Sequence, residues 1–189
     1  PGGAAHRPDQ SGGAEGGTEE ILTPDKQNAV YFSAMTFALK DTHPDYPALV
    51  LGDFILGGGS LSSRLGNRVR QKEGLSYGVG SNFAASALDP RSIFYVYAIS
   101  NPENVPKLKQ VIKEELDLIL NEGVTEKELE EAKRGYLERQ TVSRASDSSL
   151  ARILAQNLHA NRTMEYYENL ESAIPEITAD QVQAALKKH

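Results

Sequence analysis

Apolar residues recur at two different spacings along this chain, and the spacing indicates which segments are strands and which are helices. Segments 27–39, 75–87 and 92–100 are short and rich in β-branched and aromatic residues, which is typical of strands. Residues 27–39 are apolar at both odd and even positions. We therefore expect a strand covered on both faces, or one covered by helices on one side. The Leu-Asp-Pro-Arg sequence at 88–91 predicts a turn between the second and third strands.

Helical spacing appears between the first and second predicted strands. A turn at 41–45 leads to Pro47, which suits the first turn of a helix, and apolar residues recur at positions 49, 50, 54 and 55. Three consecutive glycines at 57–59 are expected to end this helix. Ser60 is placed to cap a second helix, in which Leu61, Leu65 and Val69 share one stripe.

From residue 101 to its end the chain is predicted to be helical. A first helix carries apolar residues at 105, 108, 112, 116 and 119 and ends at Gly123. Capping boxes at 125–128 (Thr-Glu-Lys-Glu) and 178–181 (Thr-Ala-Asp-Gln) begin two more helices, and 150–158 and 164–173 are amphipathic. The element order predicts an α+β fold, with helices packed on one face of a mostly antiparallel sheet.

The start of the chain differs in composition from the rest. Six of the first twenty residues are Gly, mixed with Pro, Ser and Glu, and such a stretch buries too little apolar surface to become ordered. We predict a disordered linker or cloning-related tail at 1–21, followed by a single domain at 22–189.

Composition and charge exclude several classes of function. Hydrophobic residues make up 39% of the 189 residues, and no apolar stretch approaches the roughly 20 residues of a membrane span. The formal charge of −6, with basic residues interleaved with Glu, argues against a nucleic-acid partner. The absence of Cys excludes a thiolate nucleophile and any disulfide. A soluble protein of the cytoplasm, the periplasm or an organelle would fit equally well.

The familiar catalytic motifs are missing from this sequence. The four histidines, His6, His43, His159 and His189, are far apart in the chain and form no helical zinc-peptidase motif. We therefore expect no metal site, with His43 in a turn, His159 on a helix surface and the other two at frayed ends. The serines at 60–63 follow glycines but form neither a nucleophile elbow nor a phosphate loop.

One segment combines basic residues with a tyrosine at a predicted sheet margin. Three arginines, Arg64, Arg68 and Arg70, share a short helix that is followed by Gly74 and by a strand containing Tyr77. A tight turn at Gly74 could bring Arg70 and Tyr77 together, and both could donate to a peptide carbonyl that gains negative charge. The alternative is structural: Arg70 pairs with Glu73 at i,i+3, and Tyr77 packs at the edge of the core.

Several motifs agree in order and spacing with a known family. Residues 62–79 contain a small-Arg-Leu helix start, a basic residue, a Lys-Glu-x-Leu turn and a small-Tyr-x-Val strand. Further motifs lie at 45–59, 101–104, 122–129 and 177–182. From about Leu22 to its end, the chain resembles the C-terminal, non-catalytic domain of pitrilysin/insulinase (M16) zinc metallopeptidases, including mitochondrial-processing-peptidase-like proteins.

The resemblance implies a role for the Arg and Tyr. In this family, the Arg before the Lys-Glu turn and the Tyr seven residues later reach a zinc site on the N-terminal half and bind the substrate carbonyl. The matching positions are Arg70 and Tyr77. The implied partners are a peptide substrate and an N-terminal zinc-bearing half or partner subunit. Zinc and the general base are expected in that half, so this chain would hold no cofactor and would not hydrolyse peptides alone.

Other interpretations of the resemblance remain open. The chain could be a catalytically inactive scaffold, or the partner subunit of an M16-type heterodimer in which the zinc motif lies on another polypeptide. Relative to the family, a strand-helix unit before Leu22 and a closing strand after Lys188 are not seen, which indicates an incomplete domain. The compartment, the peptide specificity and the oligomeric state do not follow from the residues.

Overall fold

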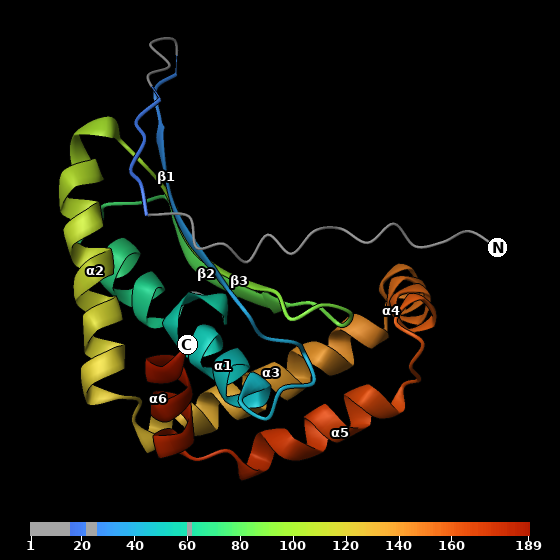
Figure 1. Cartoon of the computed structure of the whole chain (residues 1–189). Helices are drawn as coiled ribbons and strands as arrows, with labels where there is room; N and C mark the ends of the chain where they lie inside the picture. The colour runs from blue at the N-terminus through green and yellow to red at the C-terminus, as the bar shows by residue number, and fades with distance from the viewer. Residues whose placement is uncertain (1–15, 22–25, 60–61) are drawn as a thin grey trace.

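The structure is a computed structural model that describes residues 16–21, 26–59 and 62–189. Its element order is β1, two helical segments, the β2–β3 hairpin and then a series of helices to the end of the chain. Figure 1 shows one sheet with the helices gathered on one side of it. This arrangement confirms the predicted α+β class.

The sheet is antiparallel and has the strand order β1-β3-β2. Strand β1 (Ala29–Phe37) pairs with β3 (Ser92–Ser100) along its full length, from Ala29 opposite Ser100 to Phe37 opposite Ser92. Strand β2 (Gly78–Ala85) forms the hairpin with β3 that the turn at 88–91 predicts. The strand predicted at 75–87 is thus shorter in the structure.

The two faces of the sheet have different environments. On the face toward the helices, Val96 and Ala98 of β3 are buried and Tyr31 of β1 packs against the core. On the opposite face, the register brings Val30 and Phe32 beside Ile99 and Tyr97. Val30 is 71% exposed and Phe32 is 60% exposed. Of the two predictions for residues 27–39, coverage by helices on one side is the one that the structure supports.

A continuous helical rod lies directly beneath the sheet. Helix α1 (Tyr46–Asp53) begins with Pro47 in its first turn and passes into the π-helical segment η1 (Phe54–Gly58). The rod therefore continues through two of the three glycines that we expected to end it. Gly57 explains the close packing, because a Cβ there would lie 2.5 Å from the backbone nitrogen of Ser81 on β2.

A second π-helical segment, η2 (Gly66–Lys72), corresponds to the helix predicted after the glycines. Leu65 and Val69 of the predicted stripe are buried. Ser60 and Leu61, the other residues of that prediction, lie outside the described residues. After η2, a turn at Gly74 leads into β2.

The remaining helices form the outer part of the layer. A short 3-10 turn, η3 (Pro102–Asn104), leads to α2 (Val105–Glu122), which buries Leu108, Ile112 and Ile119 as predicted. Gly123, at φ 76°, ends α2, and the Thr125 capping box begins α3 (Glu126–Arg144).

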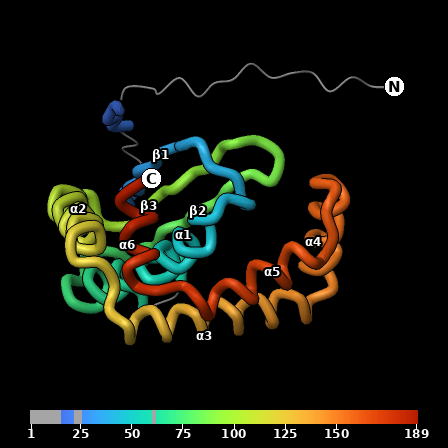
Figure 2. Tube along the Cα trace, turned by 60° about the horizontal axis from the view of Figure 1, so that its bottom comes forward, coloured from blue at the N-terminus to red at the C-terminus, as the bar shows by residue number. Residues whose placement is uncertain are grey.

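The last helices complete this layer. Helix α4 (Asp147–His159) follows, and α5 (Glu165–Ala173) runs back beside α3 (Figure 2). The 3-10 turn η4 (Ile174–Glu176) leads to α6 (Ala179–Lys188), which packs on α1.

The core lies between the sheet, the α1–η1 rod and the helices around it. Its largest fully buried side chains come from segments spread between residues 39 and 182: Leu39, Leu51, Leu65, Val69, Val96, Leu108, Val111, Ile112, Ile119, Leu129, Ile174 and Val182. None of the described helices is long and apolar enough to cross a membrane. Residues 1–15 and 22–25, which carry most of the predicted tail and the predicted start of the domain, lie outside the described residues.

Candidate functional site

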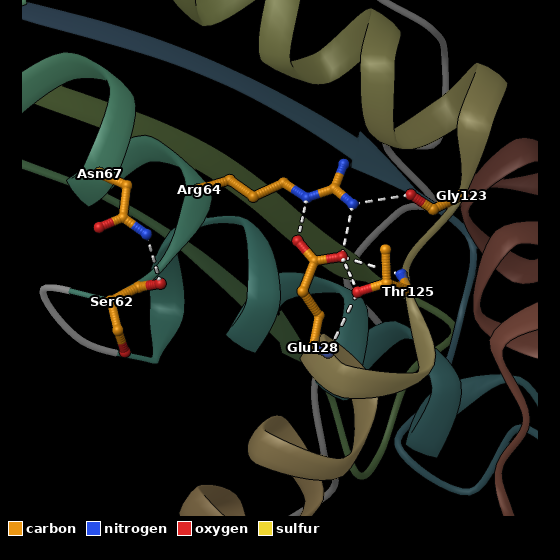
Figure 3. Close-up of polar contacts among 6 residues, drawn as sticks. All are labelled: Ser62, Arg64, Asn67, Gly123, Thr125 and Glu128. Atoms are coloured by element: carbon orange, nitrogen blue, oxygen red, sulfur yellow. Dashed lines mark hydrogen bonds and ion pairs between the residues drawn. The ribbon is translucent and has the colours of Figure 1, made fainter. Parts of the chain in front are cut away.

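Arg64 anchors the segment that carries the predicted site residues. Its guanidinium donates from Nε to Oε1 of Glu128 at 2.7 Å, and from Nη2 to Oε2 of Glu128 at 2.9 Å. The same Nη2 donates to the carbonyl oxygen of Gly123 at 2.9 Å. Figure 3 shows this bidentate pair between Arg64, just before η2, and the first turn of α3. A bidentate pair limits both distance and orientation, so η2 is held in a defined position against α3.

Glu128 also belongs to the capping box of α3. Its Oε2 accepts from the backbone nitrogen of Thr125 at 2.8 Å, while the Thr125 hydroxyl accepts from the backbone nitrogen of Glu128 at 3.2 Å. The hydrogen bonds from Arg64, followed by those from Thr125, lower the pKa of Glu128 to about 2. The Arg64 Nη1 is buried and has no hydrogen-bond partner within the described chain.

Arg68, one turn after Arg64, is engaged in a separate cluster. Its Nε lies 3.2 Å from Oε1 of Glu73, and its Nη2 lies 3.1 Å from Oε2 of Glu114 on α2. Lys107 also contacts Glu73, at 3.0 Å. Hydrogen bonding from Lys107, with a further contribution from Arg68, holds the pKa of Glu73 below its ordinary value. The structural alternative, in which Glu73 pairs with Arg70, is therefore wrong, because Arg68, two residues earlier, and Lys107 contact Glu73 instead.

Arg70 is exposed near the end of η2. Within the part of the chain that the structure describes, its guanidinium forms no ion pair or hydrogen bond. The chain then turns at Gly74, whose φ of 61° favours glycine, as the predicted tight turn requires. The backbone nitrogen of Leu75 donates to the carbonyl oxygen of Val69 at 2.9 Å, which fixes the turn on the helix that carries Arg70.

Tyr77 lies just before β2, on the other side of the Gly74 turn. Its backbone nitrogen donates to Ile99 at 2.9 Å, and its side chain is 64% exposed. The phenol donates to Oδ1 of Asn101 at 3.0 Å. Ser76 beside it is buried, with its Oγ 2.7 Å from the carbonyl oxygens of both Gly78 and Ile99. The backbone around Tyr77 is thus held at the sheet margin while its ring faces solvent, so the alternative of core-edge packing is wrong.

The arrangement offers two exposed donor groups on a fixed turn: Arg70, which has no partner among the described residues, and Tyr77, whose hydroxyl would exchange Asn101 for a ligand. Arg70 and Tyr77 make no contact with each other among the described interactions, but the backbone on each side of Gly74 is tied to the helix and to the sheet. A guanidinium and a phenol can both donate to a peptide carbonyl and stabilise charge that develops on its oxygen. Neither is a nucleophile or a general base in this setting.

A partly buried carboxyl, that of Asp53, supports the sheet behind this segment. Ser81 of β2 donates to Oδ1 of Asp53, at the end of α1, at 2.6 Å. Burial raises the pKa of Asp53, and the hydrogen bond from Ser81 opposes that shift. The sequence contained no signal for this pair, since the two residues are 28 positions apart and neither belongs to a motif.

The structure brings two of the scattered histidines together. His43, before α1, and His189, after α6, lie with Asp45 so that one ligand atom from each falls within 4.8 Å of the others. We expected His189 at a frayed end, yet its ring stacks on Phe37 with centroids 5.7 Å apart and its side chain is only 12% exposed. That expectation is wrong, because α6 packs on α1 and carries the residue inward.

Comparison with known families and proteins matches this chain to one group. Residues 4–136 match the family described as the peptidase M16 inactive domain. A curated relative, the non-peptidase homolog YmxG of Helicobacter pylori, is 25% identical over 174 residues, which are 91% of this chain and 39% of the relative. An uncharacterized zinc protease of Streptomyces coelicolor is 32% identical over 132 residues, or 69% of this chain and 28% of the relative.

Solved structures show the same similarity. The peptidase M16 inactive domain from Pseudomonas fluorescens is 32% identical, with a TM-score of 0.71 over 85% of this chain and 38% of that one. A protease from Helicobacter pylori has a TM-score of 0.71 at 19% identity, over 83% of this chain and 37% of that one, and shows the shared fold alone. The chain therefore spans less than two fifths of the length of these relatives. It belongs to the peptidase M16 inactive-domain family.

Proposed function

We propose that this chain positions peptide substrates for a zinc-dependent endopeptidase, with Arg70 and Tyr77 as donors to the substrate carbonyl. One observation carries the proposal. Arg64 and Arg68 on the same short helix are both engaged by carboxylates, whereas Arg70 is exposed and has no partner among the described residues. An arginine without a structural partner, on a turn that is tied at both ends, is available to bind a ligand.

The chemistry would be divided between two parts of a larger assembly. Zinc, held by an N-terminal half or a partner subunit, would activate a water for attack on the peptide. Arg70 and Tyr77 would donate to the carbonyl oxygen as it becomes negatively charged. Such donors stabilise the transition state more than the ground state, and more than bulk water would. This chain would supply no metal ligand for that reaction, so it would not hydrolyse peptides alone.

The exposed face of the sheet is a second feature that suits a larger assembly. The apolar residues on this face are Val30, Phe32, Ile93, Tyr97 and Ile99, all of them exposed. Contiguous apolar surface of this kind commonly marks an interaction site. We infer that it faces the zinc-bearing part or its substrate.

A second candidate function is a catalytically inactive partner or scaffold. The observation in its favour is the relationship to a Helicobacter pylori protein that is named a non-peptidase homolog. In a scaffold, Arg70 and Tyr77 would be ordinary surface residues, and substituting them would leave the activity of any associated peptidase unchanged.

The test is peptide hydrolysis by this chain together with its zinc-bearing part. We expect Arg70→Ala and Tyr77→Phe each to lower kcat roughly a hundredfold, because each removes a donor to the developing oxyanion. Lys72→Ala is the matched control, since it removes an exposed cation two residues away, and it should change kcat less than twofold. Unchanged turnover in both site variants, with unchanged zinc content, would favour the scaffold.

A further inference from the structure

A cluster of three metal-binding side chains lies away from the Arg70 turn, where α6 meets the start of α1. His43 and Asp45 come from the turn that leads into α1, and His189 follows the last residue of α6. Asp45 Oδ2 lies 2.9 Å from Nε2 of His189 and 3.8 Å from Nδ1 of His43. The two imidazole rings stand edge to face, with centroids 5.3 Å apart. His43 and His189, 146 positions apart in the sequence, thus have their ligand atoms close together.

The cluster is held in place by its surroundings. The ring of His189 stacks on Phe37. His43 Nδ1 accepts from the backbone nitrogen of Asp45 at 3.0 Å, and this hydrogen bond has to open before the single lone pair of that nitrogen binds an ion. The side chains of His43, Asp45 and His189 are 33%, 27% and 12% exposed. They are shielded enough to lose little freedom on binding an ion, yet open enough for an ion to enter. Contact between α1 and α6 fixes the two halves of the cluster relative to each other.

The distances suit a tetrahedral ion with nitrogen and oxygen ligands. Zinc binds histidine nitrogen and carboxylate oxygen at about 2.0–2.2 Å, which places neighbouring ligand atoms of a tetrahedron about 3.3 Å apart. The separations of 2.9 Å and 3.8 Å lie on either side of that value. The ligand nitrogens of His43 and His189 lie within 4.8 Å of each other, so the side chains would have to draw together by up to about 1.5 Å to complete the geometry.

The ammonium group of Lys188 already occupies the position beside Asp45 that an ion would take. Its Nζ lies 2.7 Å from Oδ2 of Asp45, and its side chain is mostly exposed. Lys188 donates to the same carboxylate oxygen of Asp45 that would bind the ion, so an ion at this oxygen must displace the ammonium group. An exposed lysine on a flexible stem can move into solvent when an ion takes its place.

We propose that His43, Asp45 and His189 form a three-ligand site for a divalent transition metal of the zinc class. Water occupies the fourth position. The site is separate from the zinc expected in the other part of the assembly and does not depend on the function proposed for Arg70 and Tyr77. Its effect is to clip α6 to the start of α1. An ion that binds only the folded chain stabilises it in proportion to the logarithm of its concentration.

The experiment uses the chain with His6→Ala and His159→Ala, so that the remaining imidazoles belong to the cluster. The probes are Zn²⁺ in calorimetric titration and Co²⁺ in visible absorption, at a pH where imidazole is neutral. We expect one ion per chain, the intense Co²⁺ bands of a tetrahedral site, and a higher Tm with Zn²⁺. His43→Ala and His189→Ala should each weaken binding about tenfold or more.

The histidine variants could lose Zn²⁺ binding simply because they fold less well. Lys188→Met avoids this ambiguity, because the proposal expects it to bind Zn²⁺ more tightly. Removal of the competing ammonium should strengthen Zn²⁺ binding several-fold, because the carboxylate no longer exchanges one cation for another. If Asp45 serves only as an ion-pair acceptor, Lys188→Met lowers stability and no Zn²⁺ binds. The proposal fails if the titration shows no binding, or if binding persists unchanged in the double variant His43→Ala/His189→Ala.

Discussion

Glu128 accepts two parallel hydrogen bonds from the guanidinium of Arg64, across 64 positions of sequence. This pair joins the π-helical segment η2 to the capping box of α3, so the helix that carries Arg70 is positioned by a residue that does not face the candidate site. Because Arg64 and Arg70 share one short helix, substitutions at these two arginines separate a positioning role from a ligand-binding one.

Arg64→Met should destabilise the chain by about 1–3 kcal/mol, because it leaves the partly buried carboxylate of Glu128 without its cation. Arg70→Met, on the same helix, should change stability by less than about 0.5 kcal/mol, since an exposed side chain without a partner is removed. Urea denaturation of both variants measures the difference. Equal losses in the two would contradict the assignment of separate roles.

Glu128→Gln should show a pH-dependent loss of stability. The pKa of Glu128 in the folded chain is about 2, below the ordinary value of 4.5. The ionised carboxylate therefore contributes stability above about pH 4.5, and this contribution is lost as the pH falls toward 2. Glutamine keeps the capping-box geometry but not the charge, so wild type and variant should differ near neutral pH and converge in acid.

The control for this charge change is Glu126→Gln, in the same first turn of α3. Glu126 is exposed, so its effect on stability should be small and nearly constant over the same pH range. Chemical denaturation at several pH values provides the comparison. A difference between wild type and Glu128→Gln that stays constant down to pH 2 would show that the ion pair with Arg64 contributes nothing.

Gly57→Ala should destabilise the chain by about 1–3 kcal/mol through overpacking. A Cβ at Gly57 would lie 2.5 Å from the backbone nitrogen of Ser81 and 2.7 Å from its Oγ, so the α1–η1 rod would have to move away from β2. Gly78→Ala is the matched control, because nothing lies within 4 Å of a Cβ there. Thermal unfolding of the pair tests the close approach, and a Tm for Gly57→Ala at or above that of the control would argue against it.

Gly74→Ala should cost about 1–2 kcal/mol for a different reason. Nothing lies within 4 Å of a Cβ at Gly74, but its φ of 61° is strained for a residue with a side chain. Asparagine tolerates this conformation better, so Gly74→Asn should lose less stability than Gly74→Ala. If the two variants unfold at the same denaturant concentration, backbone strain is not the cause.

Local signals in the sequence predicted local structure well. The capping boxes at Thr125 and Thr178 begin α3 and α6, and the glycines at 74 and 123 adopt positive φ where turns were expected. Each of these features depends on hydrogen bonds or steric limits within four or five residues, so the residues themselves determine the outcome.

Pairings between distant segments were predicted less well. Spacing offered Arg70 as one alternative partner for Glu73, but Glu73 pairs with Arg68 and with Lys107, because α2 lies beside η2 and adds a competing charge. The apolar pattern of residues 27–39 left two alternatives, a strand covered on both faces or on one, and the structure supports the second, since β1 lies at the edge of the described sheet with one face uncovered. In both cases the outcome depends on which other parts of the chain pack against the segment, and not on the residues of the segment alone.

By itself, the sequence determined the α+β class, the absence of a helical zinc motif and the positions of Arg70 and Tyr77 on either side of a glycine turn. Only the tertiary structure decided that Arg64 and Arg68 are engaged while Arg70 is exposed, and that His43, Asp45 and His189 meet. The physical reason is the distance along the sequence over which each interaction acts. Turn and cap chemistry acts over a few residues, whereas ion pairs and ligand clusters form between side chains that packing brings together from distant parts of the chain.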